Sequence, residues 1–225
     1  MHVQVPGAGR GPHPSVTGIG GIARVGILGG TFNPPHLGHL VCAQEALVQL
    51  GLARVVLIPA RMPPHKPVPD EPGAGHRLAL CRLAVDGDQR FAVADDELVR
   101  PGPSYTVDTL QELHSQAPDS ELFLIVGGDV AAGLPRWREP ERVLSLATLA
   151  VARRRGTARA SVADALQGLR GGERAEFFAM PRIGVSSTMV RRRVRAREPI
   201  RYIVPDAVAS YIDEHRLYTG GPEAG

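Results

Sequence analysis

A glycine-rich turn that follows directly on an apolar run is the feature that most constrains how this chain can fold. The run covers residues 23–28, the turn begins with Gly29 and Gly30, and a helix is expected to start at His36. Glycines allow backbone N–H groups to approach an anion closely, because no side chain stands between these groups and the ligand. A buried strand, a glycine turn and a helix start together form a common phosphate site of α/β proteins. The pattern therefore predicts that the chain binds a nucleotide.

Two histidines at the start of the expected helix point to the same kind of ligand. His36 and His39 lie three residues apart, so on a helix they share a face and can both point towards a bound phosphate. The stretch from Gly29 to His39 closely resembles the G-G-T-F-D-P-x-H-x-G-H signature of the HxGH nucleotidyltransferase superfamily. Members of that superfamily transfer a nucleotidyl group from a triphosphate and release pyrophosphate. Asn33 stands where the signature has Asp, and we expect the exchange to be tolerated because both side chains favour tight turns.

A cluster of hydroxyl side chains near the other end of the chain is a second candidate phosphate anchor. Ser186, Ser187 and Thr188 stand at an expected helix start, and Arg191 follows one turn later. A helix start concentrates free N–H groups and positive dipole, so backbone, hydroxyls and guanidinium can hold a polyphosphate together. The segment resembles the I-S-S-T-x-I-R element of the same superfamily. We therefore expect the two anchors to meet around one triphosphate.

Apolar and amphipathic segments alternate along the rest of the chain. The expected strands are 23–28, 54–58, 91–94, 122–126, 148–152 and 176–180. The expected helices are 36–50, 76–85, 106–114 with Ser104 as its cap, 139–146, 162–169, 187–197 with Ser186 and Ser187 as its cap, and 205–215. Such alternation implies right-handed crossovers and a parallel sheet. The expected fold class is α/β, a Rossmann-like doubly wound parallel sheet with helices on both faces.

Composition is consistent with one nucleotidyltransferase domain over residues 23–220. The chain has 225 residues, 43% of them hydrophobic and 22% charged, which suits one sizeable core. The Gly- and Pro-rich residues 1–22 are expected to be a disordered tail or the product of an upstream start codon. No apolar run approaches the roughly 18 residues of a membrane span, so no membrane segment is expected. Cys42 and Cys81 form no zinc or disulfide pattern, which fits a reducing cytoplasm.

Further segments resemble one branch of the superfamily, the bacterial nicotinate mononucleotide adenylyltransferases. They are Pro63-Pro64-His65-Lys66, Ser104-Tyr105-Thr106, Gly127-Gly128-Asp129 and Trp137, and the resemblance runs from about residue 25 to Tyr218. It implies transfer of the adenylyl group of ATP to nicotinate mononucleotide, which gives deamido-NAD and pyrophosphate. Mg²⁺ is expected only as a complex with the ATP phosphates, because it prefers oxygen ligands and keeps several waters, so no protein metal ligand is assigned.

The same resemblance assigns roles to individual residues. It implies catalytic roles for His36, His39 and Arg191. It implies an ATP site composed of Gly29, Gly30, Thr31, Phe32, His36, His39, Gly127, Asp129, Ser186, Ser187, Thr188 and Arg191, in which Asp129 holds a ribose. It implies a nicotinate nucleotide site composed of Lys66, Thr106, Trp137, Arg138 and Arg154. There Trp137 stacks on the nicotinate ring, while the Thr106 hydroxyl and the Arg138 backbone N–H hold its carboxylate. Arg154 corresponds to the arginine of an R-P-G turn, in which Arg155 replaces the proline.

Several alternatives stay open at the level of the sequence. The acceptor can instead be nicotinamide mononucleotide or phosphopantetheine, and a glycerol-phosphate cytidylyltransferase or a nucleotide-binding regulator without chemistry is a further possibility. The arginines of residues 191–197 suggest an RNA-binding module, but aromatic residues make up only 4% of the chain and none interleave with these arginines. No nucleic-acid partner is therefore expected. The net charge of +3 suits a nucleotide as well as a nucleic acid, and the oligomeric state stays unknown.

Overall fold

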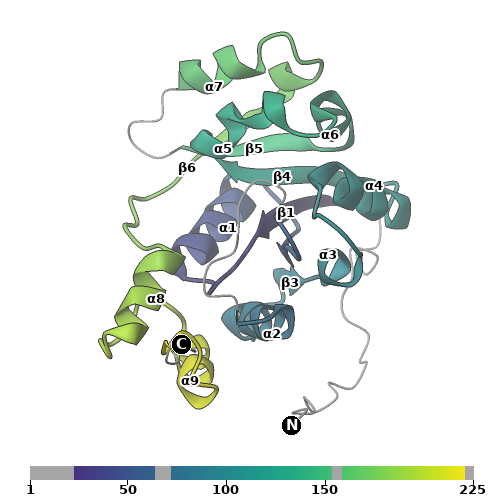
Figure 1. Ribbon diagram of the computed structural model, residues 1–225. Helices are drawn as coiled ribbons and strands as arrows, with labels where there is room; N and C mark the ends of the chain where they lie inside the picture. Colours follow the sequence, from purple (N-terminus) through teal and green to yellow (C-terminus); the bar gives the residue numbers. More distant parts are fainter. Residues whose placement is uncertain (1–22, 64–71, 154–158, 221–225) are drawn as a thin grey trace.

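Six apolar segments pair into one parallel sheet in the strand order β3-β2-β1-β4-β5-β6 (Figure 1). The structure is a computed structural model, and it describes residues 23–63, 72–153 and 159–220. The strands are β1 (Arg24–Gly30), β2 (Arg54–Pro59), β3 (Phe91–Val93), β4 (Glu121–Gly127), β5 (Thr148–Arg153) and β6 (Glu176–Ala179). The order reverses between β1 and β4, so the carboxyl ends of these two strands form the switch point where α/β proteins bind ligands.

Helices connect the strands and cover both faces of the sheet. The α-helices are α1 (Leu37–Gln49), α2 (Ala74–Val85), α3 (Asp96–Val99), α4 (Thr106–Gln116), α5 (Gly128–Ala132), α6 (Pro140–Leu146), α7 (Arg159–Leu166), α8 (Ser187–Arg195) and α9 (Asp206–Glu214). The described residues also form the short 3-10 helices η2 (Leu134–Arg136) and η3 (Gly172–Arg174). The expected fold class and each expected strand and helix are confirmed, with ends that differ by a few residues. The short helices α3 and α5 had no signal in the sequence.

Alternate residues of each central strand enter different apolar cores. On one face, Ile27 and Leu124 pack with residues of α4, α6 and α7, while on the other face Leu57 and Phe123 pack with residues of α1 and with Cys81 of α2. This alternation is the period of two expected for strands buried on both sides. The polar ends of the strands are thereby left as the place where a ligand can reach the sheet.

A third apolar cluster joins the last two helices to α2. It contains Leu80 of α2, Val190 of α8, and Val208 and Ile212 of α9, all of them buried. Figure 1 shows α8 and α9 beside α2 at the lower end of the molecule. The cluster brings the second candidate anchor, at the start of α8, to the side of the molecule where α1 begins.

Two expectations concern the extent of the N-terminal tail and of the domain. The expected tail, residues 1–22, lies outside the described residues, and the single domain of residues 23–220 stays a prediction. Among the described residues, no helix is long and apolar enough to cross a membrane.

Candidate active site

The two histidines of the first anchor cap α1 with their side chains. His36 is the N-cap residue, and its Nδ1 accepts a hydrogen bond from the Gly38 backbone N–H at 3.1 Å. The backbone N–H of His36 in turn donates to Nδ1 of His39 at 3.2 Å, which completes a capping box. Because each Nδ1 is an acceptor, the proton of each neutral ring lies on Nε2. Both rings can therefore donate a hydrogen bond through Nε2.

The imidazole rings lie face to face, with centroids 3.8 Å apart and an angle of 27° between the planes. Gly38 makes this arrangement possible, since a Cβ atom at this position would lie 3.0 Å from the His36 ring. His36 is 7% exposed and the His39 ring packs edge-on against Phe32, at 5.0 Å between centroids. The local sequence thus fixes two Nε2 donors side by side at the start of a helix, where anions bind.

Hydrogen bonds join the second anchor directly to the first. Ser186 caps α8 by accepting from the Met189 backbone N–H at 3.2 Å, so this expected cap is confirmed. The Ser187 hydroxyl donates to the Pro34 carbonyl at 2.8 Å, and Nη1 of Arg191 donates to the Asn33 carbonyl at 2.8 Å. These pairs span 153 and 158 residues of sequence. The structure therefore brings the glycine turn, the histidines and the start of α8 into one place.

Arg191 holds this junction from a buried position. Its side chain is only 6% exposed, and Nη2 lies 3.4 Å from the Thr188 hydroxyl. A buried guanidinium is costly to desolvate, so its hydrogen bonds to fixed acceptors orient it firmly. The arrangement presents positive charge beside the two histidines.

A second buried arginine, Arg77 of α2, braces the same turn and was missed by the sequence analysis. It is 1% exposed, and its Nη1 donates to the Thr31 carbonyl at 3.0 Å and to the Ala60 carbonyl at 2.7 Å. It thereby ties the residues after β1 to the residue after β2. No sequence signal separates this arginine from the exposed arginines of amphipathic helices, because only the tertiary packing buries it.

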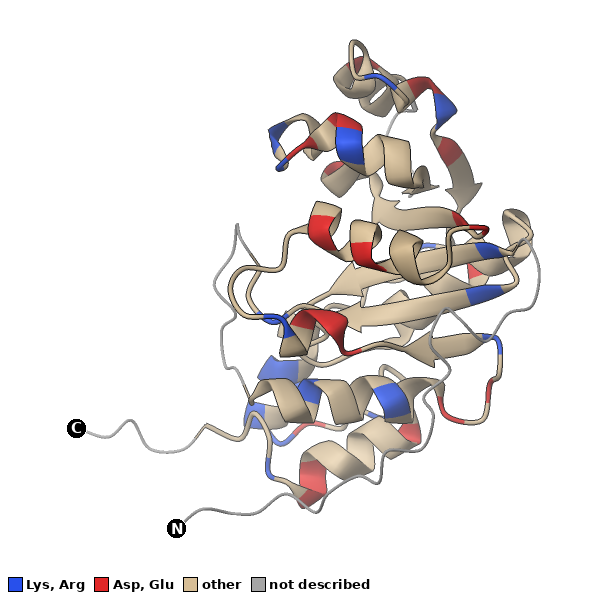
Figure 2. Ribbon diagram, turned by 90° about the vertical axis from the view of Figure 1, so that its right-hand side faces the viewer, with Lys and Arg blue, Asp and Glu red and all other residues tan. Residues whose placement is uncertain are grey.

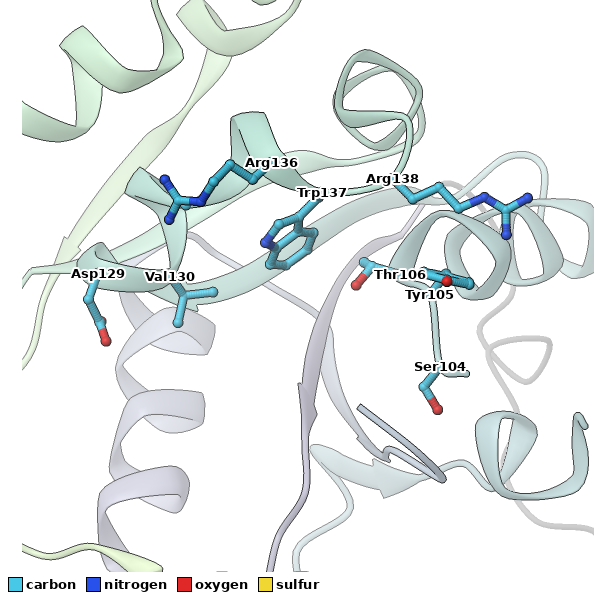
Figure 3. A pocket seen from close by; sticks show the side chains of 9 residues that line it. Ser104, Tyr105, Thr106, Asp129, Val130, Arg136, Trp137 and Arg138 are labelled. Carbon is cyan, nitrogen blue, oxygen red and sulfur yellow. The ribbon is translucent and has the colours of Figure 1, made fainter. Parts of the chain in front are cut away.

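A cavity of about 550 Å³ lies next to the switch point and contains several of the residues expected to bind the nicotinate nucleotide (Figure 3). Its lining residues are Ser104, Tyr105, Thr106, Asp129, Val130, Gly133, Arg136, Trp137 and Arg138. A second cavity of about 370 Å³ shares Ser104, Thr106, Val130 and Trp137 with it and extends to Gly29, Gly30 and Thr31. The two cavities thus form one cleft that connects the aromatic ring of Trp137 to the glycine turn.

Ser104 has a different role from the one expected. It was predicted to cap α4, but the N-cap residue is Tyr105, and no side chain caps this helix. The buried Ser104 hydroxyl instead accepts from the backbone N–H groups of Arg61, at 2.9 Å, and Met62, at 3.4 Å. The prediction was wrong because these two N–H groups, which follow the end of β2, need a hydrogen-bond acceptor. The residues around Ser104 in the sequence do not show that it meets this need.

Thr106, the first residue of α4, faces the cleft with its hydroxyl. In Figure 3 its side chain lies across the cavity opening from Trp137. Within the described part of the chain, the Thr106 hydroxyl has no hydrogen-bond partner. A hydroxyl that lines a cavity and is not used by the protein is available to a ligand.

The charged residues of the cavity differ in how they are used. The Arg138 side chain extends over the Tyr105 ring at 4.8 Å and forms ion pairs with Asp108, at 3.6 Å, and Glu139, at 3.5 Å. Its guanidinium is thus turned away from Trp137, which leaves only its backbone for the role that the sequence analysis assigned. Asp129 is exposed at the cavity rim and lies so close to residue 127 that a Cβ atom there would be 2.8 Å from Oδ1.

Two of the expected site residues, Lys66 and Arg154, lie outside the described residues. In residues 23–63, 72–153 and 159–220, no three or more His, Cys, Asp or Glu side chains lie together in a group that could hold a metal ion.

The fold and the two joined anchors define the class of this protein, a Rossmann-like nucleotidyltransferase, and the cytidylyltransferase-like family matches residues 27–193. The chain is 47% identical over 198 residues to a probable nicotinate-nucleotide adenylyltransferase of Roseiflexus sp. (strain RS-1), covering 87% of this chain and 98% of the relative. It is 42% identical to one of Synechococcus sp. (strain JA-3-3Ab), covering 87% and 94%. The chain belongs to the nicotinate-nucleotide adenylyltransferase family, and the resemblance seen in its sequence is confirmed.

Solved structures share the fold at much lower sequence identity. The nicotinic acid mononucleotide adenylyltransferase of Plasmodium falciparum, complexed with NaAD, has a TM-score of 0.73 at 15% identity, covering 89% of this chain and all of that one. A putative nicotinate-nucleotide adenylyltransferase of Vibrio parahaemolyticus has a TM-score of 0.61 at 17% identity, covering 89% and 98%. At these identities the comparison supports the fold, and the function is argued from the site.

Proposed function

We propose that the protein transfers the adenylyl group of ATP to nicotinate mononucleotide, giving deamido-NAD and pyrophosphate. The observation that carries this proposal is the hydrogen bond between Arg191 and the Asn33 carbonyl, because it places the guanidinium of one anchor beside the histidines of the other. The names of the relatives and the cleft that leads from the glycine turn to Trp137 support the same reaction.

In the proposed reaction, a phosphate oxygen of nicotinate mononucleotide attacks the α-phosphorus of ATP. A new P–O bond forms while the bond from the α-phosphorus to the bridging oxygen breaks, and pyrophosphate leaves. The attacking phosphate is already anionic, so no protein nucleophile is needed. The protein accelerates the step by aligning two anions and stabilising the charge that develops on the transferred group.

The described residues divide this task between the two ends of the cleft. His36 and His39 donate through Nε2 to the triphosphate, and Arg191 with the hydroxyl-bearing start of α8 holds its other side. Trp137 stacks on the pyridine ring, and the Thr106 hydroxyl donates to its carboxylate. Asp129 accepts from the hydroxyls of the ATP ribose, since a carboxylate can bind sugar hydroxyls but repels phosphates. Lys66 and Arg154 are proposed to bind the nicotinate nucleotide on the strength of the sequence resemblance alone.

A divalent cation is expected to enter with the ATP phosphates, and we propose that it is Mg²⁺. Bound there, it would neutralise part of the charge of the phosphates.

The arginines of α8 were also considered as an RNA-binding surface. Figure 2 shows acidic residues next to basic ones on the helices at the lower end of the molecule. Arg191 is buried, and Nη1 of Arg193 pairs with Glu198 at 3.3 Å. Part of the cationic run is thus used within the protein, and a nucleotide partner stays the favoured one.

The test is to incubate the protein with Mg²⁺ and ATP and one acceptor at a time, and to measure pyrophosphate. Nicotinate mononucleotide, nicotinamide mononucleotide and phosphopantetheine are compared. The proposal expects turnover to be fastest with nicotinate mononucleotide, and to be lost in His39→Ala but kept in the matched variant His114→Ala, whose side chain is exposed on α4. Faster turnover with either other acceptor would assign the protein to a different substrate, and no pyrophosphate with any acceptor would reject the enzyme.

A further inference from the structure

Glu97 is a buried carboxylate in the wall of the cleft for which the proposed reaction has so far given no role. It belongs to α3, directly after the carboxyl end of β3, and is 8% exposed. It lines the cavity of about 370 Å³ together with Thr106 and Trp137. Most other residues around this cavity are apolar, among them Ile58 and Leu110. A carboxylate in such surroundings is costly unless hydrogen-bond donors meet it.

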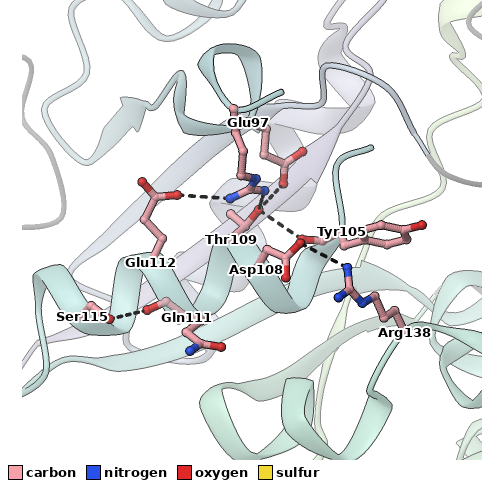
Figure 4. A network of polar contacts seen from close by, with 9 residues as sticks. Glu97, Tyr105, Asp108, Thr109, Gln111, Glu112, Ser115 and Arg138 are labelled. Carbon is pink, nitrogen blue, oxygen red and sulfur yellow. Dashed lines mark hydrogen bonds and ion pairs between the residues drawn. The ribbon is translucent and has the colours of Figure 1, made fainter. Parts of the chain in front are cut away.

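The protein supplies a donor to one of the two carboxylate oxygens. The Thr109 hydroxyl donates to Oε1 of Glu97 at 2.7 Å and accepts from Nη2 of Arg100 at 2.7 Å (Figure 4). Nη1 of Arg100 pairs in turn with Glu112 at 3.1 Å, near the surface. The chain from Glu112 to Glu97 therefore fixes the carboxylate in one orientation.

The other oxygen, Oε2, has no hydrogen-bond partner among the residues that the structure describes. Because Glu97 lines the cavity, this acceptor is available to whatever fills the cleft. Phosphate groups and the nicotinate carboxylate are anions, and a buried carboxylate repels them. A neutral hydroxyl donates to it, and the ribose of a nucleotide carries two of them next to each other.

The point on α4 at which Thr109 holds Glu97 fits the sugar of the acceptor nucleotide. Thr106 and Thr109 lie on the same face of this helix, separated by about 4.5 Å of rise at ~1.5 Å per residue. If Thr106 holds the carboxylate of the nicotinate ring, then Glu97, which Thr109 holds, lies about one helical turn away from that carboxylate. The ribose attached to the ring can reach Glu97 there. We infer that Oε2 of Glu97 accepts a hydrogen bond from a ribose hydroxyl of nicotinate mononucleotide, an inference that rests on the proposed function.

The competing explanation is that Glu97 only fastens α3 to α4. The variant Glu97→Gln separates the two, because its amide oxygen can still accept from Thr109 while its NH₂ group replaces the free acceptor. We expect KM for nicotinate mononucleotide to rise about 10- to 100-fold, the range for one hydrogen bond to a charged group, and KM for ATP to change less than about twofold. Glu121→Gln is the matched control, since Glu121 is exposed at the start of β4, at the opposite end of the strand from the cleft, and both KM values should stay unchanged.

Substrates that lack one hydroxyl make the test independent of the folding of any variant. Wild-type protein is assayed with 2′-deoxy and 3′-deoxy nicotinate mononucleotide, and one of them should lose about 10- to 100-fold in kcat/KM. In Glu97→Gln, removal of that same hydroxyl should cost little further. The inference is overturned if wild-type protein tolerates both deoxy substrates. It is also overturned if Glu97→Gln lowers kcat/KM by the same factor, relative to wild type, for all three substrates. Either result leaves the proposed function standing, which fails only if wild-type protein releases no pyrophosphate with nicotinate mononucleotide.

Discussion

At the scale of single residues, the Thr106 hydroxyl is the group that we propose to select the acid substrate over the amide. It lines both cavities and is not used by any other described residue. A carboxylate offers it an acceptor on either oxygen, whereas a carboxamide offers one acceptor and brings a donor of its own. An unpaired donor in a closed site is the usual origin of strong discrimination between such pairs.

Replacing Thr106 by Val should therefore weaken the preference for the acid over the amide. The variant keeps the shape of the side chain and removes the hydroxyl, so the ratio of kcat/KM for nicotinate mononucleotide to that for nicotinamide mononucleotide should fall about 10-fold. Thr148→Val is the control, because Thr148 begins β5 at the opposite end of the strands from the cleft. A substrate ratio that stays the same in Thr106→Val would remove this residue from the carboxylate site.

Two neighbouring arginines of α8 provide a matched pair for the phosphate site. Arg191 is buried against the Asn33 carbonyl, whereas Arg192 is exposed. Arg191→Gln should lower kcat about 10²- to 10³-fold, the usual effect of removing one group that stabilises transition-state charge. Arg192→Gln should leave kcat and both KM values close to wild type. Equal effects of the two changes, in pyrophosphate-release assays at saturating ATP, would mean that only the net charge of α8 matters.

At the scale of secondary-structure elements, α2 controls the shape of the turn after β1. Arg77 crosses from this helix to the Thr31 and Ala60 carbonyls. Arg77→Met keeps much of the apolar volume but leaves both carbonyls without this donor. Each buried acceptor left unpaired costs about 1–3 kcal/mol, so the variant should lose about 2–6 kcal/mol of unfolding free energy.

Thermal unfolding measures this loss directly. For a chain of this size, about 2–4 °C of Tm corresponds to 1 kcal/mol, so Arg77→Met should melt about 4–24 °C lower than wild type. Arg90→Met is the control, since Arg90 is an exposed residue that pairs with Asp88, and its Tm should not change measurably. If the two variants melt together, the buried guanidinium does not brace the turn.

The elements also show which features a sequence can and cannot predict. The glycine turn and the start of α8 were predictable because each is a local pattern whose chemistry is carried by consecutive residues. The roles of Arg77, Glu97 and Ser104 were not, because each depends on partners from another element that no local pattern specifies. Glu97 left one usable signal, an acidic residue four positions after a strand, near the carboxyl edge of a parallel sheet.

At the scale of the whole molecule, the C-terminal helices complete the site by packing on α2. The apolar cluster of α2, α8 and α9 holds the start of α8 against the glycine turn, so its stability should influence the junction between the anchors. The solvent-facing side of this cluster carries an aromatic group of three rings. They belong to His76 of α2, Tyr211 of α9, and His215 at the end of α9. Nδ1 of His76 lies 3.0 Å from the Tyr211 hydroxyl, and the two imidazole centroids are 5.3 Å apart.

The surroundings of His76 predict that the stability of the protein decreases as the pH falls. Burial, and to a smaller extent the nearby His215, hold the pKa of His76 below its ordinary value of 6.5. Above pH 6.5, His76 is neutral in both the folded and the unfolded chain and adds no pH dependence. As the pH falls through 6.5, the unfolded chain takes up a proton that the folded protein resists, so the free energy of unfolding decreases until the pH passes below the lowered pKa.

The expected outcome is a Tm that falls between pH 7.5 and pH 5.5 more steeply for wild type than for His76→Gln. The glutamine loses the interaction with Tyr211 at every pH, which lowers Tm throughout the pH range. Because glutamine does not titrate, the difference in slope between the two proteins reports the protonation of His76. His114→Gln, on the exposed face of α4, should keep the slope of wild type. Parallel curves for wild type and His76→Gln would show that protonation of this residue is not what couples α2 to α9, and the acid sensitivity of the fold would then have to arise elsewhere.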